Sequence, residues 1–249
     1  MRRHSGSRYD DSESRALRLS CELRRTKHSK NDKLNLEQIA LNNTLPRVFA
    51  GHDGIHSDVW RKNIVLERGQ RYLISAESGT GKSSMCSYIY GYRQDYSGTI
   101  AFDGKDIRTL TVAEWCDIRQ QHIAYLPQDM RLFGELTALE NVELKNRLTG
   151  FKSNVEIKRL FQELGIEDKQ DSLVSKLSIG QQQRVAIIRT LCQPCDFIML
   201  DEPVSHLDEE NNRIVANIIT EEARHQGAGV IATSVGNHLK MDVDTTFNL

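Results

Sequence analysis

The sequence lacks a long hydrophobic run and carries little net charge. No stretch of its 249 residues approaches the roughly 20 consecutive apolar residues that a membrane-spanning helix needs. No apolar stretch follows the basic N-terminal residues, as it would in a secretory signal. A formal net charge of −1 gives no overall field that would favour nucleic acid or anionic lipid. We therefore expect a cytoplasmic protein that does not bind nucleic acid.

Cysteine is also scarce, and five scattered residues predict no disulfide framework. Cys192 and Cys195 have the spacing of a redox motif. However, they lie between a helical pattern and a strand pattern with no thioredoxin-like context around them. A metal site would need two further ligands, and none is near in the sequence. Two ordinary structural cysteines are the favoured interpretation.

Residues 1–33 differ in composition from the rest of the chain. Ten Lys or Arg residues stand against five Asp or Glu, and large apolar side chains are few. Such a segment buries too little apolar surface to offset the entropy lost on ordering. We predict a disordered basic tail over residues 1–33 and one domain over residues 34–249. A solvated tail is favoured over one that contacts anionic lipid or nucleic acid.

Strand and helix patterns alternate along the domain. Helical spacing predicts a mostly helical block over about residues 107–180, in which Ser153 and Glu156 form a capping box. The alternation predicts an α/β fold with a parallel sheet covered on both faces. Short apolar or alternating runs predict strands at 34–41, 64–66, 71–76, 99–102, 197–200 and 230–233, and helical spacing predicts further helices at 83–90 and around 214–219.

Residues 76–83 have the spacing of a phosphate-binding loop, although Ala76 stands where the pattern usually begins with glycine. The loop follows a strand pattern and opens a helix pattern, which is the context that the motif requires. Backbone N–H groups and the helix N-terminus attract phosphate oxygens. Lys82 reaches the β- and γ-phosphates, and the Ser83 hydroxyl ligates Mg²⁺. The candidate ATP-binding residues are Ser78, Gly79, Thr80, Gly81, Lys82, Ser83 and Ser84.

The apolar run at residues 197–200 ends in two acidic residues, Asp201 and Glu202. Asp201 is expected at the carboxyl end of a buried parallel strand, where it orients the Mg²⁺ shell. Glu202 is placed to polarise an attacking water as a general base. Together with the phosphate loop, this acidic pair predicts an ATPase that uses Mg²⁺.

Residues 177–184 read Leu-Ser-Ile-Gly-Gln-Gln-Gln-Arg. Here the chain resembles the ATP-binding cassette family, whose signature is Leu-Ser-Gly-Gly-Gln, with Ile179 in place of the first glycine. The resemblance covers about residues 34–249. It implies a P-loop NTPase fold with a mixed or parallel sheet core and a small antiparallel β subdomain. It also implies an inserted helical subdomain at about residues 107–180.

The resemblance assigns further residues to the ATP site. It implies that a second cassette subunit holds the ATP that the signature residues contact. It implies that Gln128 binds Mg²⁺ and the attacking water and links them to a membrane subunit, and that an aromatic side chain stacks on adenine. The residues that it adds are Ser178, Gly180 and Gln181 at the signature, Gln128, Asp208 across the dimer interface, and Phe49 at adenine, with Trp60 a weaker candidate.

One family landmark is absent. Ser234 stands where the family has a switch histidine that contacts the γ-phosphate and helps to position the attacking water, and His238 lies a turn later. Serine is shorter and carries no charge. Because Glu202 is present, the site is expected to work slowly, with ATP binding and dimer closure retained.

By resemblance, the chain is an ATP-hydrolysing subunit that dimerises around ATP and drives a separate membrane permease from the inner face of the cell membrane. Residues 131–142 look like the surface that docks on the permease. Their sequence is most similar to that of cassettes of the lipoprotein-releasing and macrolide-exporter type. Two alternatives stay open. Ser234 and Ala76 favour a degenerate, slowly hydrolysing ATP-binding switch. A soluble cassette in DNA repair or translation usually carries two cassettes or a long coiled-coil insertion, and this chain has neither.

Overall fold

The computed structural model describes residues 35–51, 56–76 and 79–249. The predicted tail over residues 1–33 and the candidate phosphate-loop residue Ser78 lie outside the described residues. From Leu36 onward the chain forms one structural unit. No helix in the described residues is both long and apolar enough to cross a membrane.

A five-stranded sheet forms the centre of this unit, with the strand order β6-β7-β8-β3-β9. All of its neighbouring pairs are parallel, with Leu200 opposite Ala232 between β7 and β8. Strands β7 and β8 are buried along their whole length, as expected for parallel strands covered on both faces. The strands are β3 (Arg71–Ser75), β6 (Ile123–Leu126), β7 (Phe197–Asp201), β8 (Gly229–Ser234) and β9 (Thr245–Asn248).

A second sheet is antiparallel, with the order β2-β1-β4-β5. It consists of β1 (Gln38–Pro46), β2 (Asn63–Glu67), β4 (Tyr96–Phe102) and β5 (Lys105–Asp106). The register between β1 and β4 shifts between Asn42 and Leu45. Gly98 lies against this irregularity, where a Cβ atom would come within 2.3 Å of the Asn43 carbonyl oxygen. Only glycine allows the two backbones to approach so closely.

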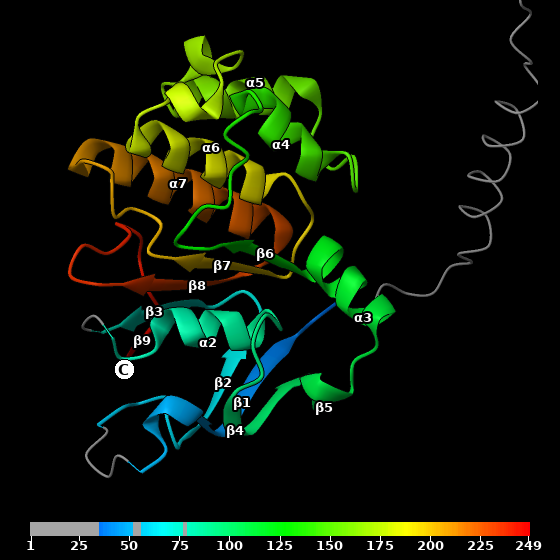
Figure 1. Cartoon of the computed structure of the whole chain (residues 1–249), viewed down its shortest axis with the longest axis vertical. Helices are drawn as coiled ribbons and strands as arrows, with labels where there is room; N and C mark the ends of the chain where they lie inside the picture. The colour runs from blue at the N-terminus through cyan, green and yellow to red at the C-terminus, as the bar shows by residue number, and fades with distance from the viewer. Residues whose placement is uncertain (1–34, 52–55, 77–78) are drawn as a thin grey trace, which may run out of the picture. The chain divides into compact units, whose positions relative to one another are not determined.

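Helices cover both faces of the parallel sheet (Figure 1). On one face lie α6 (Ile179–Leu191) and α7 (Glu209–Gln226), with α4 (Ala138–Asn146) and α5 (Asn154–Glu163) beyond them, and on the other lies α2 (Lys82–Ile89). The remaining elements are α3 (Val112–Asp117), the 3₁₀ turns η1 (Arg47–Phe49), η2 (Ile107–Thr109), η4 (Glu167–Lys169) and η5 (Val174–Lys176), and the π-turn η3 (Ile118–His122).

The strand side chains divide the core into two clusters because successive residues point to opposite faces of a sheet. Ala124, Ile198 and Val230 pack with the helices α6 and α7. Their chain neighbours, among them Phe197 and Ile231, pack with α2 and the antiparallel sheet. The phosphate-loop helix α2 and the signature helix α6 therefore lie on opposite faces of the same sheet.

Most predicted elements are confirmed, and two need correction. The capping box of Ser153 and Glu156 opens α5 as expected. The interval 107–180 is not one helical block, because residues 123–126 form β6, which pairs with β7 inside the core. This run of four residues is too short to show a strand period. The first strand is β1 at Gln38–Pro46 rather than 34–41.

Cys192 and Cys195 have the surroundings of ordinary structural cysteines. Cys192 and Cys195 are free and buried. Burial raises the pKa of the Cys192 thiol to about 12 and the pKa of Cys195 further above its ordinary value. Thiols that stay protonated at neutral pH are poor redox nucleophiles.

Candidate nucleotide-binding site

The phosphate loop connects β3 to α2. Gly79 and Gly81 have left-handed backbones, with φ of 86° and 101°. A Cβ atom on Gly81 would lie 3.1 Å from Trp60 and 3.2 Å from Phe49, so two aromatic rings line the loop at this point. No side chain among the described residues caps the N-terminus of α2. An uncapped helix N-terminus behind such a loop is suited to an anion.

Lys82 lies inside the loop and is only 4% exposed. Its Nζ donates to the Ala76 carbonyl oxygen at 3.2 Å. Burial lowers the pKa of Lys82, and the nearby carboxylates of Glu202 and Asp201 oppose that shift. The φ of Ala76 lies outside the left-handed region. Its Cβ therefore imposes no backbone strain where the usual motif has glycine.

A chain of side-chain contacts joins the three motifs. The Ser83 hydroxyl lies 3.4 Å from Gln128 Oε1, and Gln128 Nε2 donates to Glu202 Oε2 at 3.2 Å. These residues follow β3, β6 and β7, whose carboxyl ends meet at one edge of the sheet. Ligands bind at this edge of open α/β sheets. The structure thus brings together the phosphate loop, the candidate general base and the glutamine between them.

The Glu202 backbone is held in a left-handed conformation with φ of 52°. Such a conformation costs about 1–3 kcal/mol for a residue other than glycine. The surroundings hold it in place. The Glu202 amide donates to Thr233 Oγ1 at 3.1 Å, and the Thr233 hydroxyl donates to Asp201 Oδ1 at 2.7 Å. Thr233 therefore fixes both acidic residues, and nothing in the local sequence pattern predicted this.

Gln183 also reaches the acidic pair. It is 3% exposed, and its Nε2 donates to the Glu202 carbonyl oxygen at 3.2 Å. Its Oε1 accepts from the His206 amide at 3.0 Å. Gln183 thus ties the signature helix α6 to the loop that follows β7. Sequence reasoning missed this role, and the run of three glutamines at 181–183 was the available signal.

The signature residues form the start of α6. Ser178 and Gln181 make a reciprocal capping box, with Ser178 Oγ accepting from the Gln181 amide at 3.3 Å and Gln181 Oε1 accepting from the Ser178 amide at 2.9 Å. A Cβ atom on Gly180 would lie 3.0 Å from the His206 carbonyl oxygen, so a larger residue there would press on the loop that follows β7. Ile179 is 49% exposed beside them. The signature therefore lies at an accessible surface.

Asp208 caps α7, the helix that follows. Its carboxylate accepts from the Asn211 amide at 2.8 Å. The backbone and side-chain hydrogen bonds from Asn211 lower the pKa of Asp208. The carboxylate stays exposed and ionised at neutral pH, as an interface role would require.

The two aromatic candidates for adenine differ in their settings. Trp60 is 3% exposed, and its Nε1 donates to the Thr80 carbonyl oxygen at 3.0 Å. A ring buried against the phosphate loop is not open to a base, so the weaker candidate is wrong. Phe49 is half-buried at the end of η1 and lies beside Gly81. Its contact with adenine stays a prediction.

Ser234 is the last residue of β8 and is buried. Its carbonyl oxygen accepts from the Ala76 amide at 3.3 Å, which joins it to the start of the phosphate loop. His238 lies on the exposed loop beyond, where its carbonyl accepts from Asn212 on α7. The structure therefore places Ser234 beside the start of the phosphate loop.

The donor set fits a hard cation. The Ser83 hydroxyl, the Gln128 amide oxygen and the Asp201 carboxylate all present oxygen, which Mg²⁺ prefers. Ser83 and Gln128 are in contact, and Asp201 is oriented from behind by Thr233.

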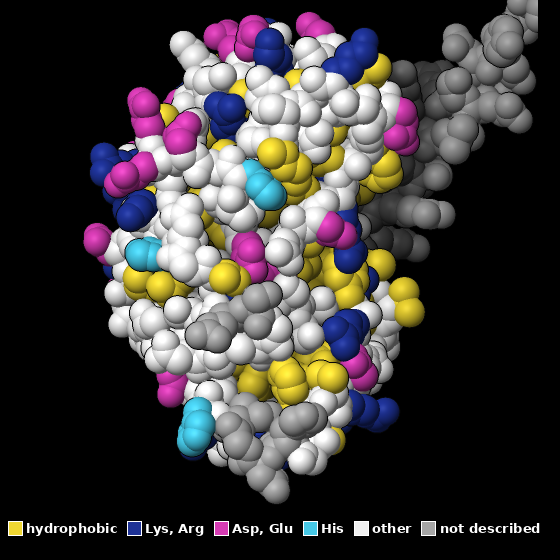
Figure 2. Space-filling view, turned by 60° about the vertical axis from the view of Figure 1, so that its left-hand side comes forward, with side chains coloured by type: hydrophobic (Ala, Val, Ile, Leu, Met, Phe, Trp, Pro, Cys, Tyr) yellow, Lys and Arg dark blue, Asp and Glu magenta, His cyan; other side chains and the backbone are white. Residues whose placement is uncertain are grey.

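The strands run from the α3 side toward the left of Figure 1, which is the side that comes forward in Figure 2. Acidic, basic and histidine side chains mix on the face that Figure 2 shows.

A phosphate loop at the carboxyl edge of a parallel sheet defines a nucleotide-binding protein with the P-loop NTPase fold. Within that class the chain belongs to the ABC transporter family, since the sequence profile of that family matches residues 61–205, more than half of the chain. The predicted fold and the predicted ATP-binding cassette are thereby confirmed.

Individual relatives agree with this assignment. The chain is 29% identical to the lipoprotein-releasing system ATP-binding protein LolD of Shewanella denitrificans over 212 residues, which cover 83% of this chain and 90% of that one. It is 32% identical to the macrolide export ATP-binding/permease protein MacB of Pasteurella multocida over 202 residues, 80% of this chain and 31% of that one. The predicted likeness to these two types of cassette is confirmed.

Solved structures of one bacterial ABC transporter cassette, MJ0796, also match. Its dimeric structure covers 79% of this chain and 87% of that chain, with 28% identity and a TM-score of 0.67. A dimeric post-hydrolysis state of the same cassette, bound to ADP and Pi, covers 80% of this chain and 88% of that chain, with 27% identity and a TM-score of 0.65.

Proposed function

We propose that this chain hydrolyses ATP with Mg²⁺ as one of two cassettes in a dimer and thereby drives a separate membrane permease. The contact chain from Ser83 through Gln128 to Glu202 carries the proposal, because it assembles the phosphate loop and a general base in one site. The names of the relatives, which include a lipoprotein-releasing ATP-binding protein and a macrolide export protein, support a role in transport.

The roles of the residues follow from their chemistry. Lys82 and the N-terminus of α2 attract the phosphates of ATP. Ser83, Gln128 and Asp201 would hold Mg²⁺, which would supply positive charge to offset that of the β- and γ-phosphates. Glu202 accepts a proton from the attacking water. Gln128 orients that water, since its amide group already bridges Ser83 and Glu202.

The two-cassette arrangement is supported by the likeness of the chain to two dimeric structures of an ABC transporter cassette. In the proposed dimer, Ser178, Gly180 and Gln181 contact the γ-phosphate bound by the partner cassette. The partner is a second copy or a related chain.

Coupling to the permease is proposed to run through the Gln128 loop, defined as residues 127–131. Met130 and Arg131 in this loop have left-handed backbones, with φ of 56° and 49°. Arg189 donates to both of their carbonyl oxygens, to that of Arg131 at 2.8 Å. A change at Gln128 is thereby passed to residues 131–142, the proposed docking surface at the inner face of the membrane.

The test is steady-state ATP hydrolysis by the purified chain, with and without Mg²⁺. We expect turnover that disappears in Glu202→Gln and rises in Ser234→His, since the new imidazole can contact the γ-phosphate. Thermal melting of each variant controls for folding. Wild type and Glu202→Gln that are equally inactive while both bind ATP would overturn the ATPase assignment, unless a permease restores turnover.

A second candidate function is an ATP-binding switch with little turnover. Ser234 favours it, because a buried serine next to Ala76 replaces the switch histidine. ATP-dependent dimerisation without hydrolysis would identify it. A soluble cassette acting in DNA repair or translation is the third candidate, and a neighbouring gene for a membrane-spanning protein would argue against it.

A further inference from the structure

Arg93 lies on the loop that follows α2, and three groups hold its side chain. Its Nε and Nη2 donate to the two carboxylate oxygens of Asp95, at 2.9 and 2.5 Å. The guanidinium carbon lies 5.3 Å from the centre of the Tyr88 ring. Nη1 donates to the Ser84 hydroxyl oxygen at 3.0 Å. A guanidinium that is bound along one edge and stacked on an aromatic ring is fixed in place before any ligand binds.

The loop that carries this arginine is itself bound to α2. The amides of Tyr92 and Arg93 both donate to the Ser87 carbonyl oxygen, at 2.8 and 3.3 Å. The Asp95 carbonyl oxygen accepts from the Tyr88 hydroxyl at 3.2 Å. The hydrogen bond from Arg93 lowers the pKa of Asp95, so this carboxylate stays ionised at neutral pH. The position of the guanidinium is therefore set by the fold of the loop.

The same loop contacts the turn that carries Phe49, the candidate for adenine. The amide of Arg47, at the start of that turn, donates to the Asp95 carbonyl oxygen at 2.9 Å. Phe49, at its end, would lie 3.2 Å from a Cβ atom on Gly81. Ser84 follows three residues later, on the same side of the first turn of α2. The Ser84 hydroxyl therefore lies on the side of the phosphate loop that faces the candidate for the base.

The order of groups in a nucleotide then assigns a phosphate to Ser84. Lys82 and Ser83 serve the β- and γ-phosphates and Mg²⁺ in the proposed function. Between these phosphates and the base lie the α-phosphate and the ribose. A side chain that follows Ser83 and lies toward Phe49 is therefore closest to the α-phosphate.

The contact with Arg93 decides what the Ser84 hydroxyl can do. A hydroxyl donates one hydrogen bond and accepts two, and Arg93 fills one of the acceptor positions. Burial raises the pKa of Tyr88, and hydrogen bonding from Ser84 opposes that shift, so the tyrosine oxygen competes for the hydroxyl hydrogen. An ionised phosphate oxygen is the stronger acceptor. The hydroxyl is thus set up to donate to a phosphate.

We propose that Arg93 is a positioning residue of the nucleotide site, which is anchored by Asp95 and orients the Ser84 hydroxyl so that it donates to the α-phosphate. The presence of the α-phosphate rests on the proposed function, whereas the orientation of the hydroxyl rests on the contacts of Arg93. Asp95 offsets the charge of the guanidinium, so the effect depends mainly on the direction of the hydrogen bond. ATP and ADP share the α-phosphate, and the binding of both depends on Arg93.

Arg108 offers a matched control. Its guanidinium also pairs with an aspartate two residues away, with Nη2 donating to Asp106 Oδ2 at 2.7 Å, and lies 5.8 Å from the centre of the Tyr96 ring. Its side chain is 42% exposed, against 44% for Arg93. Its further hydrogen bond goes to Thr99 Oγ1 on β4, at 3.4 Å. Arg108→Met therefore removes the same kinds of contact at a different place in the fold.

The test is binding of ADP and of the two ADPαS diastereomers to the full chain with Mg²⁺, measured by calorimetry. Each diastereomer replaces a different oxygen of the α-phosphate by sulfur, which is a weaker hydrogen-bond acceptor. In Arg93→Met we expect ADP to bind about 5-fold more weakly and the ratio of the two ADPαS Kd values to change by about 5-fold. Arg108→Met should match wild type in both. An unchanged ratio in Arg93→Met, or an equal change in Arg108→Met, overturns the inference, because a merely structural loss weakens both diastereomers alike.

Ser84→Ala shows whether the arginine acts through the hydroxyl. It should change the ratio as Arg93→Met does, and the double variant should show no further change. A further change of about 5-fold in the double variant would mean that Arg93 acts without Ser84 and would overturn the positioning role. Thermal melting checks the fold of each variant.

The outcomes for Arg93 and for the proposed ATPase are separate, because ADP binding needs no turnover. A chain that shows the expected ratios but hydrolyses no ATP loses only the proposed ATPase. A chain that hydrolyses ATP with an unchanged ratio in Arg93→Met loses only the role of Arg93.

Discussion

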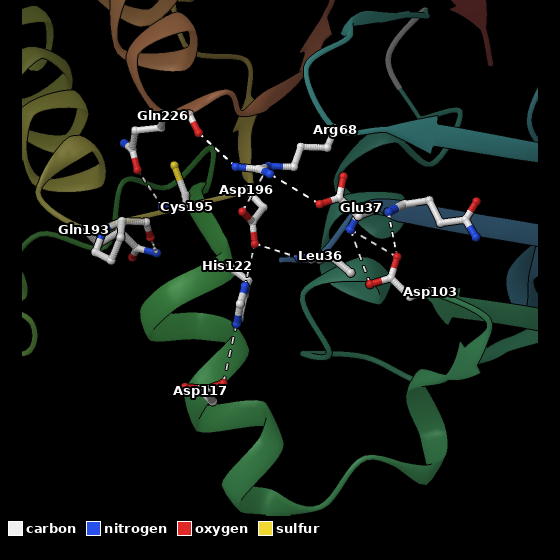
Figure 3. A network of polar contacts seen from close by, with 12 residues as sticks. Leu36, Glu37, Arg68, Asp103, Asp117, His122, Gln193, Cys195, Asp196 and Gln226 are labelled. Atoms are coloured by element: carbon white, nitrogen blue, oxygen red, sulfur yellow. Dashed lines mark hydrogen bonds and ion pairs between the residues drawn. The ribbon is translucent and has the colours of Figure 1, made fainter. Parts of the chain in front are cut away.

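His122 Nδ1 lies 2.5 Å from Asp196 Oδ2 (Figure 3). Asp196 is 5% exposed, and the same Oδ2 atom accepts from the Leu36 amide at 2.8 Å. Arg68 Nε lies 3.1 Å from the other carboxylate oxygen. His122 precedes β6 and Asp196 precedes β7, so this cluster lies at the amino ends of the strands. It joins the antiparallel sheet to the parallel sheet at the edge opposite the nucleotide site.

This contact makes stability depend on pH. The hydrogen bond to Asp196 raises the pKa of His122, burial opposes the shift, and Asp117 adds to it. A raised folded-state pKa means that the contribution is fully present below about pH 6.5, the unfolded value. It is lost as the pH rises through the folded-state value. His122→Gln should therefore cost about 1–2 kcal/mol at pH 6 and less at pH 8.5, measured by urea unfolding.

His225→Gln is the matched control, because His225 is exposed on α7. A substitution at this exposed position should change the free energy of unfolding by less than about 0.5 kcal/mol. An equal loss for His122→Gln at pH 6 and pH 8.5 would show that the imidazole acts through packing rather than charge.

Thr233→Val should impair hydrolysis more than ATP binding. The hydroxyl holds the Glu202 amide and the Asp201 carboxylate together, and valine has nearly the same shape. We expect turnover to fall about 10-fold and stability to fall by about 1–3 kcal/mol, because a buried acceptor loses its donor. Thr220→Val removes a hydroxyl that bonds only within α7, and its turnover should match wild type. Equal kinetics in the two variants would contradict the role of Thr233.

Gln183→Met tests the link between α6 and Glu202. Methionine fills a similar volume but cannot donate to the Glu202 carbonyl or accept from the His206 amide. Turnover should fall about 10-fold with a smaller change in KM, since the acid moves while the phosphate loop does not. Gln162→Met, on the exposed face of α5, is the control. A change confined to KM would argue that Gln183 supports binding instead.

Lys152 and Glu222 form a buried ion pair at 2.7 Å, with side chains 6% and 9% exposed. Removing one partner leaves an uncompensated buried charge. Lys152→Met should therefore destabilise the chain by about 3 kcal/mol in urea unfolding. Adding Glu222→Leu should recover most of that loss, because the pair is then replaced by apolar groups. A double variant no more stable than Lys152→Met would refute this view.

Local patterns predicted much of the fold and the site. Continuous apolar runs identified β7 and β8, and the capping box at Ser153 located the start of α5, because such signals depend on a few neighbouring residues. The phosphate loop and the acidic pair were recognisable for the same reason. The motifs are also expected to meet in space, since parallel strands bring their carboxyl ends to one edge of the sheet.

The sequence by itself therefore determined the family, the alternation of strands and helices, and the residue types at the nucleotide site. Only the tertiary structure decided which residues support that site. Thr233 meets Asp201 across 32 positions of the chain, and Gln183 meets Glu202 across 19. Only the fold showed that Trp60 is buried against the phosphate loop and that Arg93 contacts Ser84. Contacts at such separations in the sequence depend on strand order and packing. The spacing of apolar residues within a short segment does not encode either of these.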